Sequence, residues 1–160
     1  INWEEMPAAA QPRFRGVRSA EGEALVLQQN IFLEQSLVRG TLRAYTEAEL
    51  AEYHRPFLQP GEDRRPMLTW PRELPISGEP ANVVEIFEAY GAWLARSPIP
   101  KLYIRAAPGT HSPKIIEQAR RWPNQQEVTV PGIHYPQEDA PEQVGAALSA
   151  WLKSWRGAAN

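Results

Sequence analysis

Histidine is the residue type in this sequence best suited to acid–base chemistry at neutral pH, because the ordinary pKa of an imidazole is about 6.5. His134 lies in residues 131–139, directly after the β-rich run 127–130 and before a strongly patterned C-terminal helix. A loop at that place can bring an imidazole over the end of a sheet while rigid elements hold both sides. A loop histidine taken alone is more often structural, although at this place it can act as a general base.

The other two histidines have weaker claims to chemistry. His54 is a polar position in a predicted helix, so we interpret it as structural. His111 lies in the loop 106–112, where it could be a surface residue or a substrate contact. Their spacing from carboxylates matches no metal-binding motif, so we predict no metal site. The sequence has no cysteine, which excludes a disulfide framework, a thiolate metal site and a cysteine nucleophile.

Composition limits the classes of partner. The 160 residues suffice for one domain with a core, or for part of a larger one. The formal net charge is −2 and the arginines are scattered, so we predict no nucleic-acid partner and no binding to an anionic membrane. No apolar run approaches the roughly 20 residues needed to span a bilayer, and no signal peptide is recognisable at the start. The lack of cysteine fits a cytoplasmic protein.

Residues 1–80 read as short helices and loops without a convincing strand. Residues 22–30 have a helical pattern, which the apolar residues 31–33 continue. Thr46 followed by Glu49 is a capping-box signature, which predicts a helix from residue 47 to about 53. Several prolines then interrupt the chain.

Residues 81–160 alternate between helix and strand. The predicted elements are a helix over 81–95, a strand over 102–104, a helix over 113–121, a strand over 126–130, and a last helix capped by Asp139 with Glu142 at its third position. We expect Ile115 to face inward, and Trp93 and Trp155 to pack on helix faces. The alternation is typical of an α/β fold with a parallel sheet covered by helices.

Two strands are too few for a stable parallel sheet, because their edges and faces would stay partly uncovered. We therefore interpret residues 1–80 as a helical cap domain. Residues 81–160 then form the C-terminal part of a doubly wound core whose other strands lie outside the sequence.

Five stretches in order resemble the haloalkane dehalogenases, which belong to the α/β-hydrolase superfamily. The similarity runs from Trp3 to about Trp151 and fits the C-terminal half of such an enzyme. The stretches are LVLQQNIFLE (25–34), YHRPFL (53–58), LPISGEPA (74–81), SPIPKL (97–102) and the His134 loop through QED (137–139).

The resemblance implies a hydrolase that cleaves carbon–halogen bonds of small halogenated alkanes with water and without a cofactor. In this family an aspartate carboxylate displaces halide and forms an ester with the substrate. A histidine then activates water to hydrolyse the ester, and an acidic residue orients that histidine. The match places His134 in the role of the histidine.

The other catalytic groups do not carry over to this sequence. The nucleophilic Asp and the Asn and Trp that bind halide are expected in the N-terminal half of the same enzyme. The loop 106–112 has no carboxylate, which resembles the subfamily whose catalytic Glu lies upstream of the cap. The 160 residues alone are therefore expected to be inactive.

The resemblance also marks a substrate pocket and tunnel, although plain core positions remain an alternative for its apolar members. The matching residues are Phe14, Phe32, Trp70, Pro71 and Leu74, with His111 at the tunnel mouth. Apolar walls suit a substrate that must lose its water before nucleophilic attack.

Other functions on the same fold stay open. An epoxide hydrolase would need cap tyrosines to protonate the leaving oxygen, but Tyr45 and Tyr53 do not match those positions. A Renilla-type luciferase would use the same cap for another chemistry. A non-catalytic fragment that binds a partner through its uncovered faces is the alternative from a different class.

Overall fold

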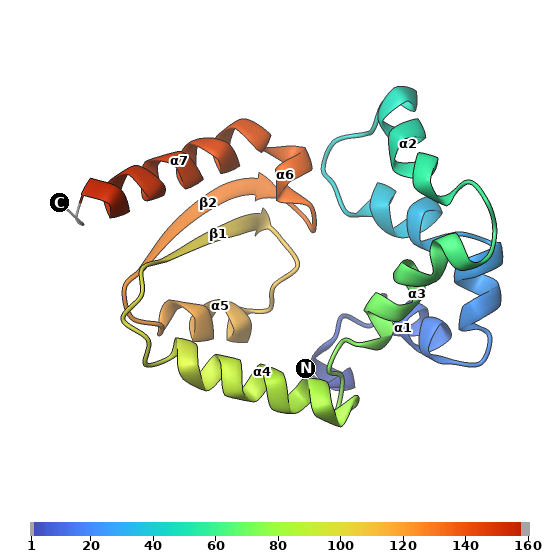
Figure 1. Ribbon diagram of the computed structural model, residues 1–160, viewed down its shortest axis with the longest axis horizontal. Helices are drawn as coiled ribbons and strands as arrows, with labels where there is room; N and C mark the ends of the chain where they lie inside the picture. Colours follow the sequence, from blue (N-terminus) through green and yellow to red (C-terminus); the bar gives the residue numbers. More distant parts are fainter. Residues whose placement is uncertain (1, 158–160) are drawn as a thin grey trace. The chain divides into compact units, whose positions relative to one another are not determined.

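The computed structural model describes the backbone of residues 2–157 and the side chains of residues 2–155, which form two compact units (Figure 1). Unit 1 comprises the chain up to Val38 and the segment Tyr45–Ala89. Unit 2 comprises Arg39–Ala44 and the chain from Tyr90 onward. No helix within residues 2–157 is both long and apolar enough to cross a membrane. The functional division into a cap over 1–80 and a core over 81–160 stays a prediction.

Unit 1 is built from short helical segments, as the sequence predicts. They are η1 (Trp3–Glu5), α1 (Gln11–Arg18), η2 (Ala24–Gln28), η3 (Phe32–Leu37), α2 (Glu47–His54), η4 (Arg55–Phe57), η5 (Glu62–Arg64), α3 (Arg65–Arg72) and the first part of α4 (Ala81–Leu94). The described part of this unit has no strand, only an isolated bridge between Ile76 and Glu79. Its core includes Val26 and Leu68, which are fully buried.

The predicted capping box starts helix α2. The Thr46 hydroxyl accepts a hydrogen bond from the Glu49 amide at 3.3 Å, and the Glu49 carboxylate accepts one from the Thr46 amide at 2.7 Å. These bonds satisfy amides that a helix start leaves without helical partners. Pro56 lacks an amide hydrogen, and the α-helix ends at His54.

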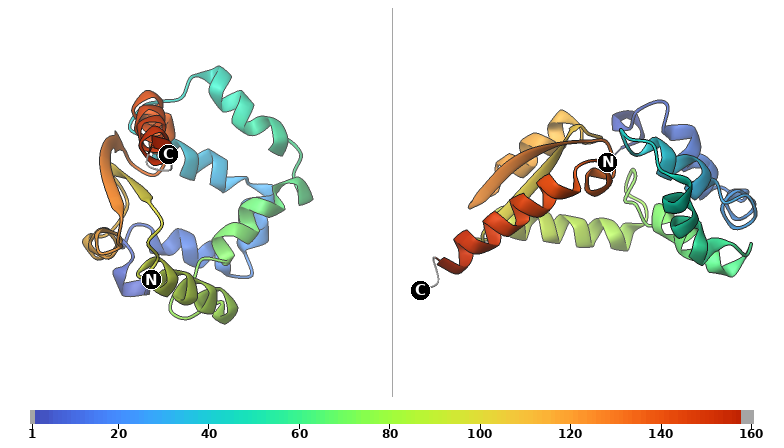
Figure 2. Two further views of the ribbon diagram at one scale, coloured as in Figure 1. Left: turned by 60° about the vertical axis from the view of Figure 1, so that its left-hand side comes forward. Right: turned by 90° about the horizontal axis from the view of Figure 1, so that it is seen from above.

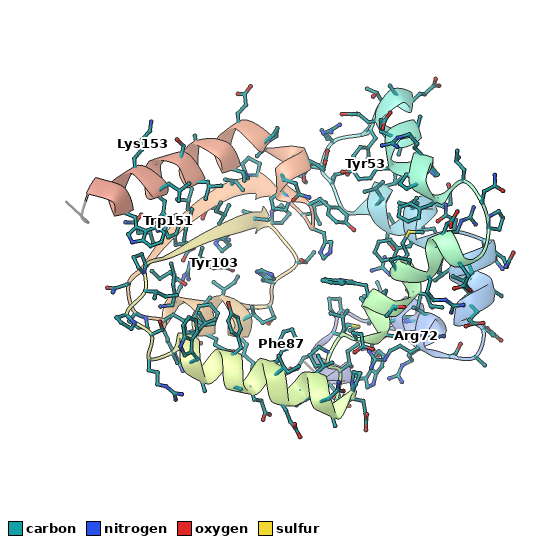
Figure 3. All side chains as sticks on the ribbon, viewed as in Figure 1. Tyr53, Arg72, Phe87, Tyr103, Trp151 and Lys153 are labelled. Carbon is teal, nitrogen blue, oxygen red and sulfur yellow. The ribbon has the colours of Figure 1, made fainter. Side chains whose placement is uncertain are left out.

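Unit 2 contains a two-stranded parallel sheet with helices on both faces (Figures 1 and 2). Its elements after α4 are β1 (Lys101–Pro108), α5 (Pro113–Arg120), β2 (Gln125–Gly132), α6 (Pro136–Asp139) and α7 (Pro141–Gly157). Figure 2 shows α5 and α7 on opposite sides of the strands. The register runs from Lys101 opposite Gln125 to Pro108 opposite Gly132, so both strands end at the same edge.

Both strands are longer than predicted, and β1 continues past its apolar run at Arg105, which pairs with polar residues of β2. The guanidinium of Arg105 lies 3.0 Å from the Glu127 carboxylate and 2.9 Å from the Thr129 hydroxyl on β2. Arg120 on α5 also contacts Glu127 at 2.6 Å. Arg120 and then Arg105 lower the pKa of Glu127 to about 2, so the carboxylate stays charged at neutral pH. Such cross-strand pairs extend a sheet beyond the hydrophobic segment.

Several apolar side chains on the helices of unit 2 remain accessible, contrary to the predicted packing. Ile115 is 37% exposed, and Trp93 and Trp155 are 43% and 50% exposed. The prediction assumed that a helix stripe always meets a sheet face. Two strands present too little surface to cover the stripes of three helices.

The predicted cap of the last helix is wrong. Asp139 ends α6, and α7 begins only at Pro141. A residue before proline is disfavoured in the α region, and Ala140 has a φ of −142° and a ψ of 55°, so the helix breaks there. The Asp139 side chain is therefore directed to other backbone groups.

Candidate functional site

His134 lies on the loop between β2 and α6, at the carboxyl edge of the sheet. The loop turns tightly at Gly132, where a Cβ atom would lie 3.0 Å from the Cα of Pro136. The His134 amide donates to the carbonyl oxygen of Gly40 at 2.8 Å. Backbone contacts thus fix the loop that carries the imidazole.

The loop after β1 meets the His134 loop at the same edge. Gly109 donates its amide to the Gly132 carbonyl at 3.0 Å. Its φ is +67°, and a Cβ atom would lie 2.4 Å from the Ala106 oxygen, so only glycine fits without rearrangement. The next residue, Thr110, places its hydroxyl 3.5 Å from Nδ1 of His134. Two glycines therefore allow the loops to approach closely.

His134 and His111 line one hollow of about 130 Å³ within unit 2. Both imidazoles are exposed, and the His134 ring lies edge-to-face on Tyr135 with 4.7 Å between ring centroids. The hollow is formed by Ile104, Ala106, Gly109, Thr110, His111, Ile133, His134 and Pro136. It combines apolar walls with two titratable rings, which suits acid–base chemistry on a small molecule.

His111 is held by Tyr103 of β1. The two rings stack with centroids 6.2 Å apart, and Nδ1 of His111 lies 3.1 Å from the phenol oxygen. Burial, and then the nearby charge of Glu127, raises the pKa of Tyr103. The phenol therefore keeps its proton at neutral pH and shares a hydrogen bond with Nδ1 of His111.

The other predicted pocket residues lie in unit 1. Phe14 is on α1, Phe32 on η3, Trp70 and Pro71 on α3, and Leu74 just after α3. Trp70 is 75% exposed, whereas Pro71 is buried. The structure brings His111 and His134 together. The lining role of all these residues stays a prediction.

Two arginines without a recognisable sequence motif connect α1 to α3 and the segment that follows it in unit 1. Arg18 donates to the carbonyl oxygens of Leu74 at 2.8 Å and Glu79 at 2.9 Å. Arg72 donates in return to the Val17 carbonyl at 3.0 Å. Their partners are backbone oxygens far along the chain, so no local pattern reveals the pair. The contacts fix the segment that carries Leu74.

His54 has a structural role in the geometry of unit 1. Its Nδ1 lies 2.6 Å from the Leu50 carbonyl oxygen, and its Nε2 lies 2.8 Å from the Glu34 carboxylate. Only the doubly protonated ring can donate to both acceptors. The pKa of His54 is raised above 6.5, mainly by the Leu50 carbonyl and then by Glu34.

This contact predicts a pH-dependent stability. A raised pKa in the folded state means that His54 stabilises the fold fully below pH 6.5, and that this contribution disappears as pH rises through the folded-state pKa. Glu34 is 54% exposed, so we expect less than about 1 kcal/mol. Urea unfolding at pH 6 and pH 9 measures the difference. The difference in unfolding free energy between the two pH values should be smaller in His54→Gln than in the unsubstituted protein. An unchanged pH profile in that variant would contradict the assignment of the effect to His54.

Comparisons with known proteins agree with the resemblance seen in the sequence. No family model matches the chain. A haloalkane dehalogenase from Mycolicibacterium smegmatis is 47% identical over 162 residues, covering all of this chain and 52% of the relative. One from Sphingobium indicum is 48% identical over 159 residues, covering 99% and 54%. Coelenterazine h 2-monooxygenase from Renilla reniformis is 38% identical over 154 residues, covering 95% and 49%.

Solved structures give the same result. The haloalkane dehalogenase DbeA from Bradyrhizobium elkani superposes with a TM-score of 0.92 at 38% identity, over 98% of this chain and 56% of the other. DatA from Agrobacterium tumefaciens, also a haloalkane dehalogenase, gives a TM-score of 0.86 at 32% identity, over 96% and 54%.

The parallel strands, their covering helices and these superpositions define an α/β-hydrolase fold, here a part with a helical unit and two strands. Within that class, the chain belongs to the haloalkane dehalogenase family, which confirms the resemblance. It spans about half the length of the curated relatives that it matches.

Proposed function

We propose that this chain supplies the cap and the catalytic histidine of an enzyme that hydrolyses haloalkanes to alcohol and halide. The observation that carries the proposal is the position of His134. It lines a hollow at the carboxyl edge of a parallel sheet, in a chain 47% and 48% identical to two haloalkane dehalogenases. Ligands of open α/β sheets bind outside the carboxyl ends of the strands.

The proposed reaction has two steps. An aspartate carboxylate from the N-terminal half of the enzyme attacks the carbon that bears the halogen, and halide leaves with the bonding electrons. The product is an alkyl ester of the enzyme. His134 then takes a proton from water while the water oxygen attacks the ester carbonyl. Collapse of that adduct releases the alcohol, which receives the proton from His134. The carboxyl group then loses the second proton of the water molecule to solvent, which restores the carboxylate.

In this proposal the apolar side chains of residues 1–80 form the substrate-facing surface of the cap. They are Phe14, Phe32, Trp70, Pro71 and Leu74. The 75% exposure of Trp70 in this chain supports a role at a surface that another component covers. His111 adds a polar group beside His134. The orienting Glu and the Asn and Trp for halide are expected from the N-terminal half, and the reaction needs no cofactor. A cytoplasmic location is part of the same proposal.

Halide release tests the proposal directly. The chain is joined to the part of the Mycolicibacterium smegmatis relative that it does not match, and the hybrid is incubated with 1-bromobutane. We expect bromide and butanol in equal amounts from the hybrid and neither from the chain alone. A folded hybrid that releases no bromide, above the rate without enzyme, would contradict the proposed function.

A second chemistry has a specific observation in its favour, the 38% identity to the Renilla coelenterazine h 2-monooxygenase. That identity is lower than that to the dehalogenases, so we rank an oxygenase second. Light emission by the same hybrid on addition of coelenterazine distinguishes the two. Emission without bromide release would reverse their order.

A further inference from the structure

The loop that carries His134 is bound to a segment almost 100 residues earlier in the chain. We name this segment, Arg39–Ala44, the strap. It interrupts unit 1 in sequence but packs as part of unit 2. The strap carbonyl of Gly40 accepts hydrogen bonds from the amides of His134 at 2.8 Å and Tyr135 at 3.1 Å. The main chain of the proposed base is thus held by the strap.

Asp139 joins the strap to the same loop. Its Oδ1 accepts from the strap amides of Leu42 at 2.7 Å and Arg43 at 3.1 Å. Its Oδ2 accepts from the amide of Ile133 at 3.2 Å. Ile133 directly precedes His134, so the carboxylate fixes the peptide next to the imidazole. Both carboxylate oxygens of Asp139 therefore accept charge-assisted hydrogen bonds from backbone amides.

Arg43 and Glu138 close the same junction. The Nε of Arg43 donates to the Glu138 carbonyl at 2.7 Å, and its Nη2 lies 2.9 Å from the Glu138 carboxylate. Space around the junction is limited as well, because a Cβ atom on Gly132 would lie 3.4 Å from Oδ2 of Asp139. The loop is therefore held by directional bonds and by close packing.

We propose that Asp139 is the positioning residue for His134: its carboxylate fastens the strap to the histidine loop and so sets the place of the imidazole. The proposal rests on the proposed function, because it assigns the effect to the ester-hydrolysing step. Asp139 itself touches no reacting atom. A displacement of about 1 Å can cost roughly 100-fold in rate, so loss of the junction should slow the step that uses His134.

The substitution Asp139→Asn tests this in the hybrid with 1-bromobutane. The asparagine side chain has one oxygen, so it can accept from the strap amides or from the Ile133 amide, but not from both. Its NH₂ group would then face a backbone N–H, and two donors cannot bond each other. We expect an unchanged first burst of bromide, an unchanged KM for burst formation, and a steady-state rate about 10- to 100-fold lower. Asp63→Asn is the matched control, because Asp63 is an exposed carboxylate in η5 of unit 1.

Two results would overturn the proposal: a steady-state rate equal to that of the Asp63→Asn control, or burst and steady-state rates that fall in equal proportion. If the unsubstituted hybrid releases no bromide, the proposed function has failed, and amide hydrogen exchange still tests the junction. Asp139→Asn should then expose the amides of Ile133 and His134 to faster exchange than in the control. Unchanged protection would refute the positioning role.

Discussion

Replacing His134 with glutamine in the hybrid should stop turnover after about one bromide has been released per enzyme molecule. Glutamine has a similar size and can hydrogen-bond, but it cannot take a proton from water. The first step does not use the histidine, so the alkyl ester should form and persist. We expect the steady-state rate to fall by about 10²- to 10⁴-fold, which is the usual effect of losing a general base. Intact-protein mass spectrometry should show the added butyl group.

His54→Gln is the control for this substitution. It makes the same change in unit 1, where His54 contacts Leu50 and Glu34 rather than the hollow that His134 lines. Its turnover should match that of the unsubstituted hybrid. Normal turnover by His134→Gln would remove His134 from the mechanism. Failure of that variant to release even the first bromide would show that the histidine also serves the halide-displacing step.

Local signals in the sequence predict the frame of the site well. Thr46 and Glu49 start α2 as expected, and the alternation of apolar runs identifies both strands and the loop of His134. Each of these features depends on residues within a few positions of one another. Capping and strand formation are short-range effects, so a single sequence can reveal them.

The hydrogen bonds that hold the His134 loop join residues far apart in the sequence, so they could not be predicted in the same way. Asp139 lies two residues before Pro141 and three before Glu142, and aspartate is a preferred N-cap residue, so the capping interpretation is the natural local one. Its true partners, Leu42 and Arg43, are more than 90 residues away. Nothing in the pattern around Gly40 indicates that its carbonyl holds the His134 loop. Hydrogen bonds to backbone groups far along the chain leave no trace in the local pattern of residue types.

Burial was mispredicted for a related reason. The helix stripes that contain Trp93 and Trp155 have the spacing of core residues, and this spacing says that a face is apolar without saying what covers it. Both tryptophans are about half exposed in the described chain. The chain spans about half the length of its relatives, so we expect these faces to pack against the remaining half. That expectation extends the proposed function.

Arg64→Met should produce the largest loss of stability in unit 1, about 3 kcal/mol in the free energy of unfolding. Arg64 is only 7% exposed, and its guanidinium donates to backbone oxygens. Those of Phe57, Gln28 and Leu27 lie at 2.8, 2.9 and 3.1 Å. Methionine fills much of the volume but removes the guanidinium donor from the carbonyls of Phe57 and Gln28, whereas the Leu27 carbonyl still accepts from the Gly61 amide. The cost is therefore that of unsatisfied polar groups rather than of a cavity.

Urea unfolding of the hybrid measures this loss, with Arg55→Met as the matched control. Arg55→Met makes the same substitution at a side chain that is 71% exposed. The ion pair of Arg55 with Glu52 should contribute less than about 1 kcal/mol to the free energy of unfolding. Arg64→Lys should recover part of the stability, because an ammonium can donate to some of the carbonyls but cannot span them as a planar guanidinium does. Equal losses in Arg64→Met and Arg55→Met would mean that the carbonyls find water instead, and that packing rather than Arg64 joins η2 to η5.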